Sequence, residues 1–306
     1  MVDALDSDSS VCLKHSGSSP EFRIPGNQSI TLTKAVRQWL VKNKILTSIQ
    51  NPLIKQIRKL HRGKERRKQN LLLLEGTNLV DTACQVDYRL DTIFYTDRWR
   101  ENHQPLCLKL AAKEIEMQLV SPEVLSAIST TVSPDGVVAI AQRRPDQESF
   151  SAQTKLGLAI ERLQDPGNLG TIIRTAVATG VDRLWLSNGS VDIDNPKVLR
   201  ASVGEWFRLP IAVDQDLSEL VRQNQQQGVQ VIATASQATK SYWEIDFNCP
   251  SLILLGNEGA GLSEELVALA DQQVKIPLAN GVESLNVAVA TALLLYEARR
   301  QLATSN

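Results

Sequence analysis

The chain has 306 residues, of which 42% are hydrophobic and 22% are charged, and its formal net charge at pH 7 is −1. This length fits two domains, and the composition is typical of globular proteins with packed cores. The balanced charge excludes a strongly basic nucleic-acid binder, so any RNA-binding surface must come from local clustering of charge.

No apolar run approaches the roughly 18 residues of a membrane span, and the acidic N-terminus lacks the apolar stretch of a secretory signal. The cysteines form no C-x-x-C pair and have no histidine at metal-binding spacing, which favours reduced thiols over a zinc site. We therefore expect a soluble, cytoplasmic protein without a metal. The cysteines are Cys12, Cys84, Cys107 and Cys249.

Residues 1–46 are predicted to form a mobile tail. Residues 1–28 are rich in Ser, Gly, Pro and Asn and have too few apolar side chains to offset the entropy lost on ordering. The pattern from Ile30 to Leu40 would fit a short amphipathic helix, to which we assign no function.

A small α/β sandwich is predicted over residues 47–142, followed by a polar linker over residues 143–155. Its first helical stretch carries eight Lys or Arg residues against one acid between Lys55 and Lys68. An apolar strand at Leu71–Leu74 then ends in Glu75-Gly76. The later elements are helices at Asn78–Cys84, Pro105–Glu114 and Pro122–Ile128, and strands at Thr92–Tyr95 and Val137–Ala141.

Residues 156–306 alternate more regularly between short apolar strands and helices. This alternation predicts a mostly parallel sheet covered on both faces, with ligands bound at the carboxyl ends of the strands. Strands are predicted at Leu156–Leu163, Arg183–Ser187, Arg208–Val213, Val229–Thr234, Ser251–Leu255 and Gln273–Ile276. Helices are predicted at Leu169–Thr179, Pro196–Val203, Leu217–Gln226, Glu264–Ala270 and Leu285–Leu302.

The first unusual loop, which we name the first motif, is Glu161–Ala176 and runs through an Asp-Pro-Gly turn into a helix. Asn168 is expected to cap that helix. Arg174 lies off the apolar face, and helical side chains lean backward, so its guanidinium would reach over the small residues Gly170 and Thr171 toward the mouth of the loop. Taken alone, Arg174 fits a solvated surface residue equally well.

The second motif, Leu254–Ser263, has three glycines in six residues after an apolar strand, which frees its backbone to approach a ligand closely. The P-loop Lys-Ser/Thr is absent, the glycine spacing is not the dinucleotide fingerprint, and Glu258 argues against an anionic ligand. Ser263 can cap the next helix. A generic glycine-rich turn is the alternative.

The third motif, Ile276–Ala290, leads into a helix that is apolar nearly all round. Such a helix must be buried on more than one side, in a core or between subunits. Ser284 would cap it if the segment were only structural. Asn286 is harder to explain in that way, because a polar amide at the start of a buried helix needs hydrogen-bond partners.

Together the three motifs resemble the SpoU (TrmH) family of the SPOUT methyltransferase superfamily in order, spacing and context. The resemblance covers about Leu156 to Leu302. Residues 47–142 resemble the family's substrate-binding domain, a ribosomal-protein-like RNA-binding fold, through Ser48-x-x-Asn51-Pro52-x-x-Lys55 and Leu74-Glu75-Gly76. The matching segments are Asn168–Ala176, Gly256–Leu262, Ile276-Pro277 and Glu283–Val287.

The resemblance implies methylation of a ribose 2′-hydroxyl in RNA with S-adenosylmethionine (SAM) as cofactor, and the extra N-terminal domain favours ribosomal RNA. It also implies a homodimer through the methyltransferase domain and a C-terminal trefoil knot, an exception to the rule against knots. The implied cofactor contacts are Thr234, Gly256, Asn257, Gly259, Ile276 and Leu285. The implied catalytic residues are Arg174, Ser284, Asn286 and Glu258.

The family assigns the role of base to Arg174, but a guanidinium is essentially always protonated. Arg174 could instead bind a neighbouring phosphate and fix the attack geometry, and the sequence leaves both roles open. RNA is expected to be held by backbone contacts that do not read sequence. The expected RNA contacts are Asn168 and the basic residues Lys55, Arg58, Lys59, Arg62, Lys64, Arg66, Arg67 and Lys68.

Three alternatives stay open at this point. The same chemistry could act on transfer RNA. The scaffold could belong to a noncatalytic RNA-binding protein, although retention of the implied catalytic residues argues against this. A nucleotide-dependent oxidoreductase would have a similar sheet, but Gly-x-Gly-x-x-Gly is missing after the first strand of residues 156–306.

Overall fold

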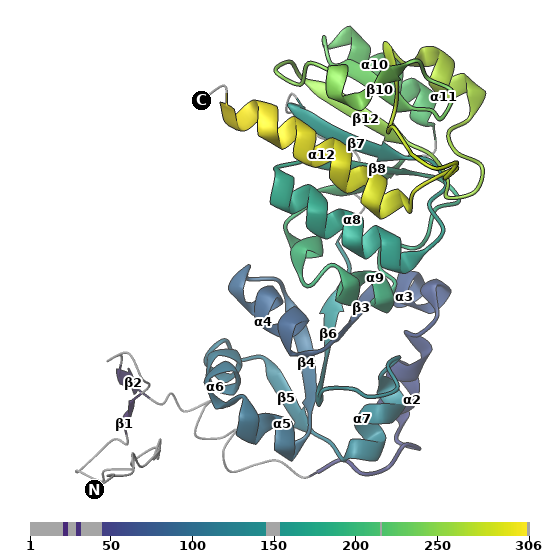
Figure 1. Cartoon of the computed structure of the whole chain (residues 1–306). Coiled ribbons are helices and arrows are strands. Elements are labelled where there is room, and N and C mark those ends of the chain that lie inside the picture. The colour runs from purple at the N-terminus through teal and green to yellow at the C-terminus, as the bar shows by residue number, and fades with distance from the viewer. Residues whose placement is uncertain (1–20, 24–28, 32–44, 145–153, 215, 305–306) are drawn as a thin grey trace, which may run out of the picture.

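The computed structural model describes residues 21–23, 29–31, 45–144, 154–214 and 216–304, and its main part forms two lobes, one above the other (Figure 1). The helix predicted at Ile30–Leu40 lies largely outside the described residues, and Ser29–Thr31 (β2) pairs antiparallel with Glu21–Arg23 (β1). Within the described ranges, no helix is both long and apolar enough to cross a membrane, and no metal-binding group of His, Cys, Asp or Glu is found.

The N-terminal lobe contains α2 (Pro52–Lys59), α3 (Gly63–Gln69), β3 (Leu71–Glu75), α4 (Thr77–Gln85), β4 (Leu90–Tyr95), α5 (Asp97–Asn102), α6 (Gln104–Ala112), β5 (Glu116–Leu119), α7 (Pro122–Ile128) and β6 (Val137–Gln142). Its four-stranded sheet has the order β3-β6-β4-β5, with β6 antiparallel to both neighbours and β4 parallel to β5. Apolar residues of α2 and α7 cover one face, and those of α4, α5 and α6 cover the other. This arrangement is an α/β sandwich, as predicted.

The basic helical stretch is two helices, because the chain leaves helical geometry between Lys59 and Gly63. Asn51 starts α2 by accepting a hydrogen bond from the Leu53 amide through its side chain (2.9 Å), and Pro52 follows at the first helical position. Two elements of this lobe, α5 and β5, were not predicted. Both are short, and α5 carries too few apolar residues for a helical period to show.

The C-terminal lobe contains β7 (Leu156–Ile160), α8 (Pro166–Thr179), β8 (Arg183–Ser187), α9 (Pro196–Ala201), the 3₁₀ turn η1 (Glu205–Phe207), β9 (Ile211–Asp214), α10 (Leu217–Gln226), β10 (Gln230–Thr234), β11 (Lys240–Ser241), η2 (Tyr242–Glu244), β12 (Ser251–Leu255), α11 (Glu264–Leu269), β13 (Gln272–Lys275) and α12 (Val287–Thr304). The parallel seven-stranded sheet has the order β11-β13-β10-β12-β7-β8-β9. Helices α8, α9 and α12 supply the core on one face, and α10 and α11 supply it on the other.

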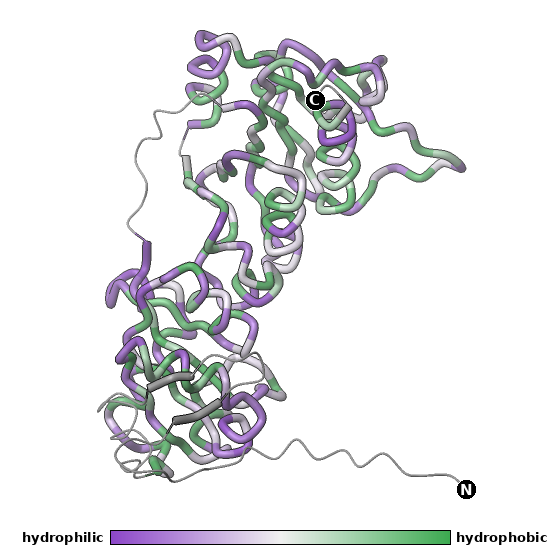
Figure 2. Tube along the Cα trace, turned by 90° about the vertical axis from the view of Figure 1, so that its left-hand side faces the viewer, coloured by the Kyte–Doolittle hydropathy of each residue, from purple (hydrophilic) through white to green (hydrophobic). Residues whose placement is uncertain are grey.

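Apolar segments gather in the centre of the C-terminal lobe (Figure 2), as expected for a sheet that is covered by helices on both faces. The predicted strand at Arg208–Val213 begins later, at Ile211, because Glu205–Phe207 turns first. The two-residue strand β11 was not predicted, since so short a segment shows no alternation.

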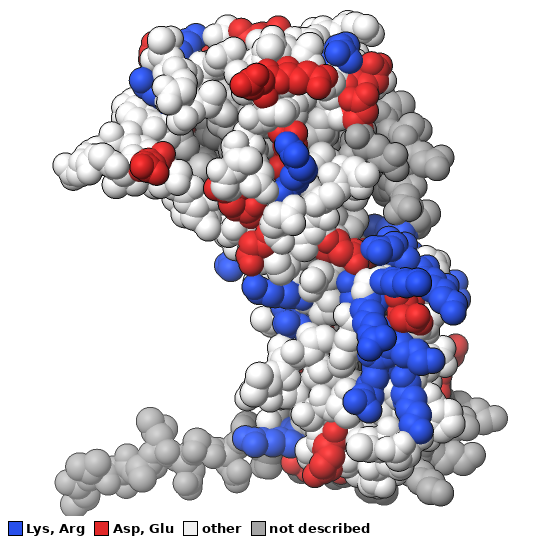
Figure 3. Space-filling view, turned by 90° about the vertical axis from the view of Figure 1, so that its right-hand side faces the viewer, with Lys and Arg blue, Asp and Glu red and all other residues white. Residues whose placement is uncertain are grey.

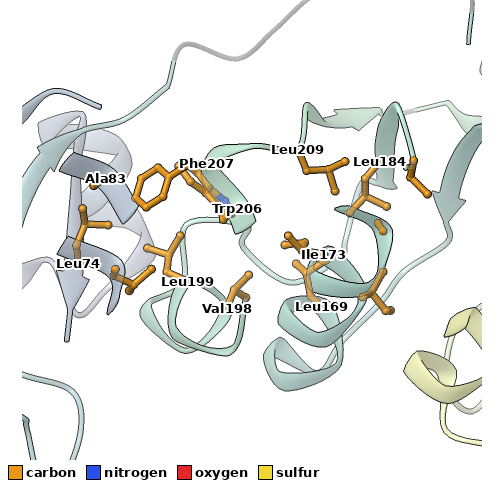
Figure 4. Close-up of a cluster of buried hydrophobic side chains, with 14 of the residues drawn as sticks. Leu74, Ala83, Leu169, Ile173, Leu184, Val198, Leu199, Trp206, Phe207 and Leu209 are labelled. Atoms are coloured by element: carbon orange, nitrogen blue, oxygen red, sulfur yellow. The ribbon is translucent and has the colours of Figure 1, made fainter. Parts of the chain in front are cut away.

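An apolar cluster crosses the boundary between the lobes (Figure 4). Trp206 and Phe207 of η1 lie beside Tyr88 of the N-terminal lobe, with ring centroids 6.1 and 4.8 Å away, and the Arg144 guanidinium stacks 4.7 Å from the Trp206 ring. Helix α9 packs along β3, which is an edge strand of the smaller sheet. Because an aromatic core and a covered sheet edge join them, the lobes form a continuous body.

Candidate active site

The site lies where β7, β12 and β13 end. In a parallel sheet these strand ends lie on one edge, so the loops that follow them can meet there. The first motif follows β7, the second follows β12, and the third follows β13 and leads into α12, which packs on α8. The loops project together at the right-hand edge of the upper lobe in Figure 1.

Asn168 connects the three motifs. Its side-chain nitrogen donates to Glu258 Oε1 (3.3 Å), and its side-chain oxygen accepts from Asn286 Nδ2 (2.9 Å). Asn286 in turn accepts hydrogen bonds from the amides of Ala288 and Val289 at the start of α12 (2.9 and 3.4 Å). Three polar residues that lie up to 118 positions apart in sequence therefore form one hydrogen-bonded chain.

The charge of Glu258 sets the direction of this chain. Partial burial acts to raise the pKa of Glu258, but hydrogen bonds from its own amide, from the Asn168 side chain and from the amides of Asp165 and Gln164 outweigh it, so the pKa lies below its ordinary value. At neutral pH the carboxylate only accepts, so Asn168 must donate to it and accept from Asn286. The donors thus run from the start of α12 toward Glu258.

The predicted capping role of Asn168 is wrong. Asp165 is the N-cap of α8, and its carboxylate accepts from the Asn168 amide (2.8 Å). That hydrogen bond, followed by the attraction of Lys197, lowers the pKa of Asp165 despite some desolvation. Because Asp165 caps the helix, the Asn168 side chain is free to join the first motif to the other two.

Asn257 holds the second motif closed. Its side-chain nitrogen donates to the Arg162 carbonyl (2.8 Å), and its side-chain oxygen accepts from the amides of Gly259 and Ala260 (2.9 and 3.1 Å). Its backbone also pairs with Gly261 through two hydrogen bonds of 3.0 Å. The Asn257 amide is therefore used within the protein, where it shapes the loop.

Gly256 allows the second motif to fold this tightly. A Cβ atom at this position would lie 2.0 Å from the Gly261 carbonyl carbon and 2.1 Å from the Leu262 nitrogen. Beside it, the Ser263 amide donates to Glu161 Oε2 (2.8 Å), and the Thr234 hydroxyl donates to the Leu254 carbonyl (3.1 Å). Glu161 was not among the predicted site residues, because the predicted strand ran to Leu163, whereas β7 ends at Ile160. A carboxylate within an otherwise apolar strand was still a usable signal.

The third motif is open to solvent from Pro277 up to the start of α12. Every residue from Pro277 to Asn286 is exposed, and the exposed fractions of the apolar residues Leu278, Val282 and Leu285 are 39%, 53% and 36%. Ser284 lies in this stretch and does not cap α12, because Asn286 does. An irregular segment with exposed apolar side chains offers both backbone hydrogen-bonding groups and apolar surface.

These features fit SAM in kind. An adenine is held by apolar walls and backbone hydrogen-bonding groups, and the stretch from Ile276 to Leu285 supplies both beside the glycine loop. The anionic Glu258 also makes this edge of the sheet suitable for a cationic sulfonium rather than for a phosphate.

Arg174 lies on α8 in the same lobe and is exposed, and it makes no hydrogen bond or ion pair with any described residue. The predicted reason for the small residue Gly170 is wrong, however. A Cβ atom there would lie 2.4 Å from the Ala201 Cβ atom, so Gly170 permits close packing of α8 on α9 and does not make room for Arg174.

Basic side chains crowd the outer surface of α2 and α3 (Figure 3). One predicted member differs, because Arg66 is only 2% exposed. It donates to the Leu60 and His61 carbonyls and forms an ion pair with Asp192 of the C-terminal lobe at 2.8 Å, so it cannot contact RNA. The exposed cations are Lys55, Arg58, Lys59, Arg62, Lys64, Arg67 and Lys68.

Comparison with known proteins identifies the family of the chain. Residues 155–296 match the model of the SpoU rRNA Methylase family, and residues 51–139 match the MRM3-like substrate binding domain. The chain is 48% identical over 256 residues to an uncharacterized tRNA/rRNA methyltransferase of Synechocystis, covering 84% of this chain and 93% of the relative. It is 36% identical, over 84% of its length and 99% of the relative, to the 23S rRNA (guanosine(2553)-2′-O)-methyltransferase RlmP of Bacillus subtilis.

Among solved structures, the AdoMet-bound rRNA methyltransferase of Sinorhizobium meliloti superposes with a TM-score of 0.75 at 35% identity, covering 85% of this chain and 98% of that one. The methylase match contains all three motifs, and the substrate-binding match contains the basic helices α2 and α3. The fold, the order of the motifs and these relatives lead to one conclusion: the chain belongs to the SpoU rRNA methylase family and carries an MRM3-like substrate-binding domain ahead of its methylase domain.

Proposed function

We propose that this protein transfers a methyl group from SAM to a ribose 2′-hydroxyl of ribosomal RNA. The observation that carries the proposal is the chain of hydrogen bonds through Glu258, Asn168 and Asn286, which joins three distant motifs. The same lobe presents Arg174, which is exposed and pairs with no residue in the described part of the chain. Two relatives that match this chain over nearly the whole of their own length support the proposal. RlmP is named for 2′-O-methylation of 23S rRNA, and the Sinorhizobium enzyme was solved with AdoMet bound.

SAM supplies a methyl group that is already activated by its sulfonium. Gly256, Ile276 and Leu285 would contact it directly, because they lie on the closed glycine loop and on the exposed third motif. Thr234, Asn257 and Gly259 would shape the pocket. Asn257 does so through the hydrogen bonds that keep the second motif closed.

In this proposal Arg174 acts on the acceptor RNA. A guanidinium remains protonated at neutral pH, so it is better suited to bind the phosphate beside the target ribose and to polarise the 2′-hydroxyl than to remove its proton. Ser284 and Asn286 would orient the ribose. Asn286 is held in place by Asn168 and by the amides at the start of α12, so its position is fixed before RNA arrives.

The seven exposed cations on α2, on α3 and at the turn between them would hold the RNA backbone. Their contacts give affinity that falls with salt and carry no sequence readout, so the choice of nucleotide must come from how the RNA is placed over the C-terminal lobe. The protein would work in the cytoplasm.

The proposal includes a homodimer formed through the C-terminal lobe. Val289, Leu293 and Tyr296 of α12 are 49%, 37% and 57% exposed, and with Tyr242 they line a hollow of about 410 Å³. A contiguous apolar face on a mostly apolar helix is suited to a second copy. The trefoil knot that the family resemblance implies is also part of the proposal.

The test is mass-spectrometric mapping of ribose methylation in ribosomal RNA from cells with and without the gene. We expect one 2′-O-methylated nucleotide to disappear with the gene and to return with the wild-type copy, but not with an Arg174→Ala copy. Identical ribosomal methylation in both strains would refute the proposal. Loss of a methylated ribose from transfer RNA alone would mean that the substrate is transfer RNA and not ribosomal RNA.

A further inference from the structure

One loop contacts both the first motif and the RNA-binding helices. This bridging loop, Asn188–Asn195, joins β8 to α9. On one side, the Val191 amide donates to the Leu163 carbonyl (2.7 Å), and Gln164 Nε2 donates to the Gly189 carbonyl (2.9 Å). The Gln164 amide itself donates to Glu258 Oε2 (3.3 Å), and Leu163 directly precedes it.

On its other side, the bridging loop holds the N-terminal lobe. Asp192 accepts from Arg66 Nη2 at 2.8 Å and lies 3.5 Å from Arg67 Nη1. Asp194 forms an ion pair with Arg143. The Arg66 and Asp194 side chains are each only 3% exposed, so both pairs are shielded from solvent, and loss of one partner leaves a buried charge.

Asp192 is itself held in place. Its Oδ1 accepts from the Asp194 amide (3.1 Å), its carbonyl accepts from the Asn195 amide (2.9 Å), and a Cβ atom on Gly63 would lie 2.5 Å from its Oδ2. Gly63 is the first residue of α3, so the absence of a side chain there lets the loop approach the helix closely. The carboxylate therefore has one position relative to α3.

We propose that Asp192 is a positioning residue that fixes the basic helix α3 relative to the first motif, and through it relative to Arg174. This inference rests on the proposed function. RNA held by α3 would then present one ribose to the site, and a shift of the helix by about 1 Å would misplace that ribose at a large cost in rate. The lobes would stay joined without Asp192, because the Trp206 cluster and the Arg200–Glu75 ion pair (2.9 Å) also connect them.

The test compares Asp192→Asn and Gly63→Ala with the wild-type protein. Asp192→Asn removes the charge with little change of shape. Gly63→Ala keeps every charge and places a better helix former in α3, but its methyl group displaces the Asp192 carboxylate. The matched control is Glu219→Gln, which breaks an exposed ion pair with Arg222 on α10, in the C-terminal lobe.

For each variant, kcat is measured on ribosomal RNA extracted from cells that lack the gene, together with the Kd values for that RNA and for SAM. We expect kcat to fall about tenfold or more in both variants, with the SAM Kd within about twofold. RNA affinity should be unchanged or tighter in Asp192→Asn, because an acid beside the basic helix is lost. Wild-type kcat in both variants would overturn the inference, as would weakened RNA and SAM binding in parallel with kcat.

Amide hydrogen exchange provides a readout that does not depend on activity. If Asp192 holds the bridging loop against α3, the Val191 amide and the amides of α3 exchange faster in Asp192→Asn than in the wild type. Glu219→Gln should change neither exchange rate. Unchanged amide exchange in Asp192→Asn would overturn the inference that Asp192 fixes α3 relative to the first motif. An inactive wild-type protein would instead count against the proposed function, and the exchange measurement would still decide the inference.

Discussion

Gly256→Ala is the change that should damage the cofactor site most selectively. The new methyl group would lie 2.0 to 2.3 Å from backbone atoms of Gly261 and Leu262, which cannot rotate away as a flexible side chain could. Overpacking of this kind costs about 1–3 kcal/mol, and opening the loop also breaks the two Asn257–Gly261 backbone hydrogen bonds, at about 1 kcal/mol each. The total of roughly 3–5 kcal/mol corresponds to a factor of about 100 to 4,000 in an equilibrium constant.

This cost should appear as weaker SAM binding rather than as unfolding. Residues Glu258–Gly261 are exposed, so the loop can open without disturbing the core. Isothermal titration calorimetry should therefore show a SAM Kd raised about 100-fold or more, while the midpoint of thermal unfolding changes by only a few degrees.

Gly259→Ala is the matched control for the fold of this loop. A Cβ atom at Gly259 would meet nothing closer than Asn257 Oδ1 at 3.6 Å, an ordinary contact, so the loop should stay closed. The Gly261 amide donates a hydrogen bond to the Asn257 carbonyl, so its rate of hydrogen exchange should rise in Gly256→Ala and not in Gly259→Ala. Wild-type SAM affinity in Gly256→Ala would refute the reasoning that this close backbone contact shapes the cofactor site.

Three other changes test separate parts of the site. Reversing the charge at three exposed positions of α2, Lys55, Arg58 and Lys59, should weaken RNA binding. The slope of log affinity against log salt concentration should become shallower by about 0.7 to 0.9 per lost phosphate contact. An unchanged slope in a filter-binding series would place the RNA surface elsewhere. Leu293→Asp should convert a dimer into a folded monomer in light scattering after gel filtration, and a persistent dimer would contradict the role given to α12. The lowered pKa of Glu258 means that its stabilising contribution is complete above the ordinary value of 4.5 and is lost as pH falls through the folded-state pKa. The loss of thermal stability on acidification should be smaller in Glu258→Gln than in the wild type. Identical profiles of unfolding midpoint against pH for the two proteins would count against the Glu258 network.

The sequence was sufficient for the sheet and for the convergence of the motifs, because the apolar periods mark the strands and a parallel sheet places their carboxyl ends on one edge. It was insufficient where a residue depends on a partner far along the chain. Arg66 shares its basic pattern with its neighbours, and only contact with Asp192, 126 positions away, shows that it is buried. Asn168 was mistaken for a helix cap because Asp165 and Asn168 are both residue types that can cap the helix start, and their hydrogen bonds are needed to distinguish them.

The central claim is tested most directly by methyl transfer from isotope-labelled SAM to ribosomal RNA by the wild-type protein and by Arg174→Ala. We predict that the wild-type protein places the label on a ribose 2′-oxygen, and that Arg174→Ala lowers the rate at least about 100-fold while the SAM Kd stays within a few-fold. Label on a base, or an Arg174→Ala protein that methylates ribose at the wild-type rate, would contradict the account.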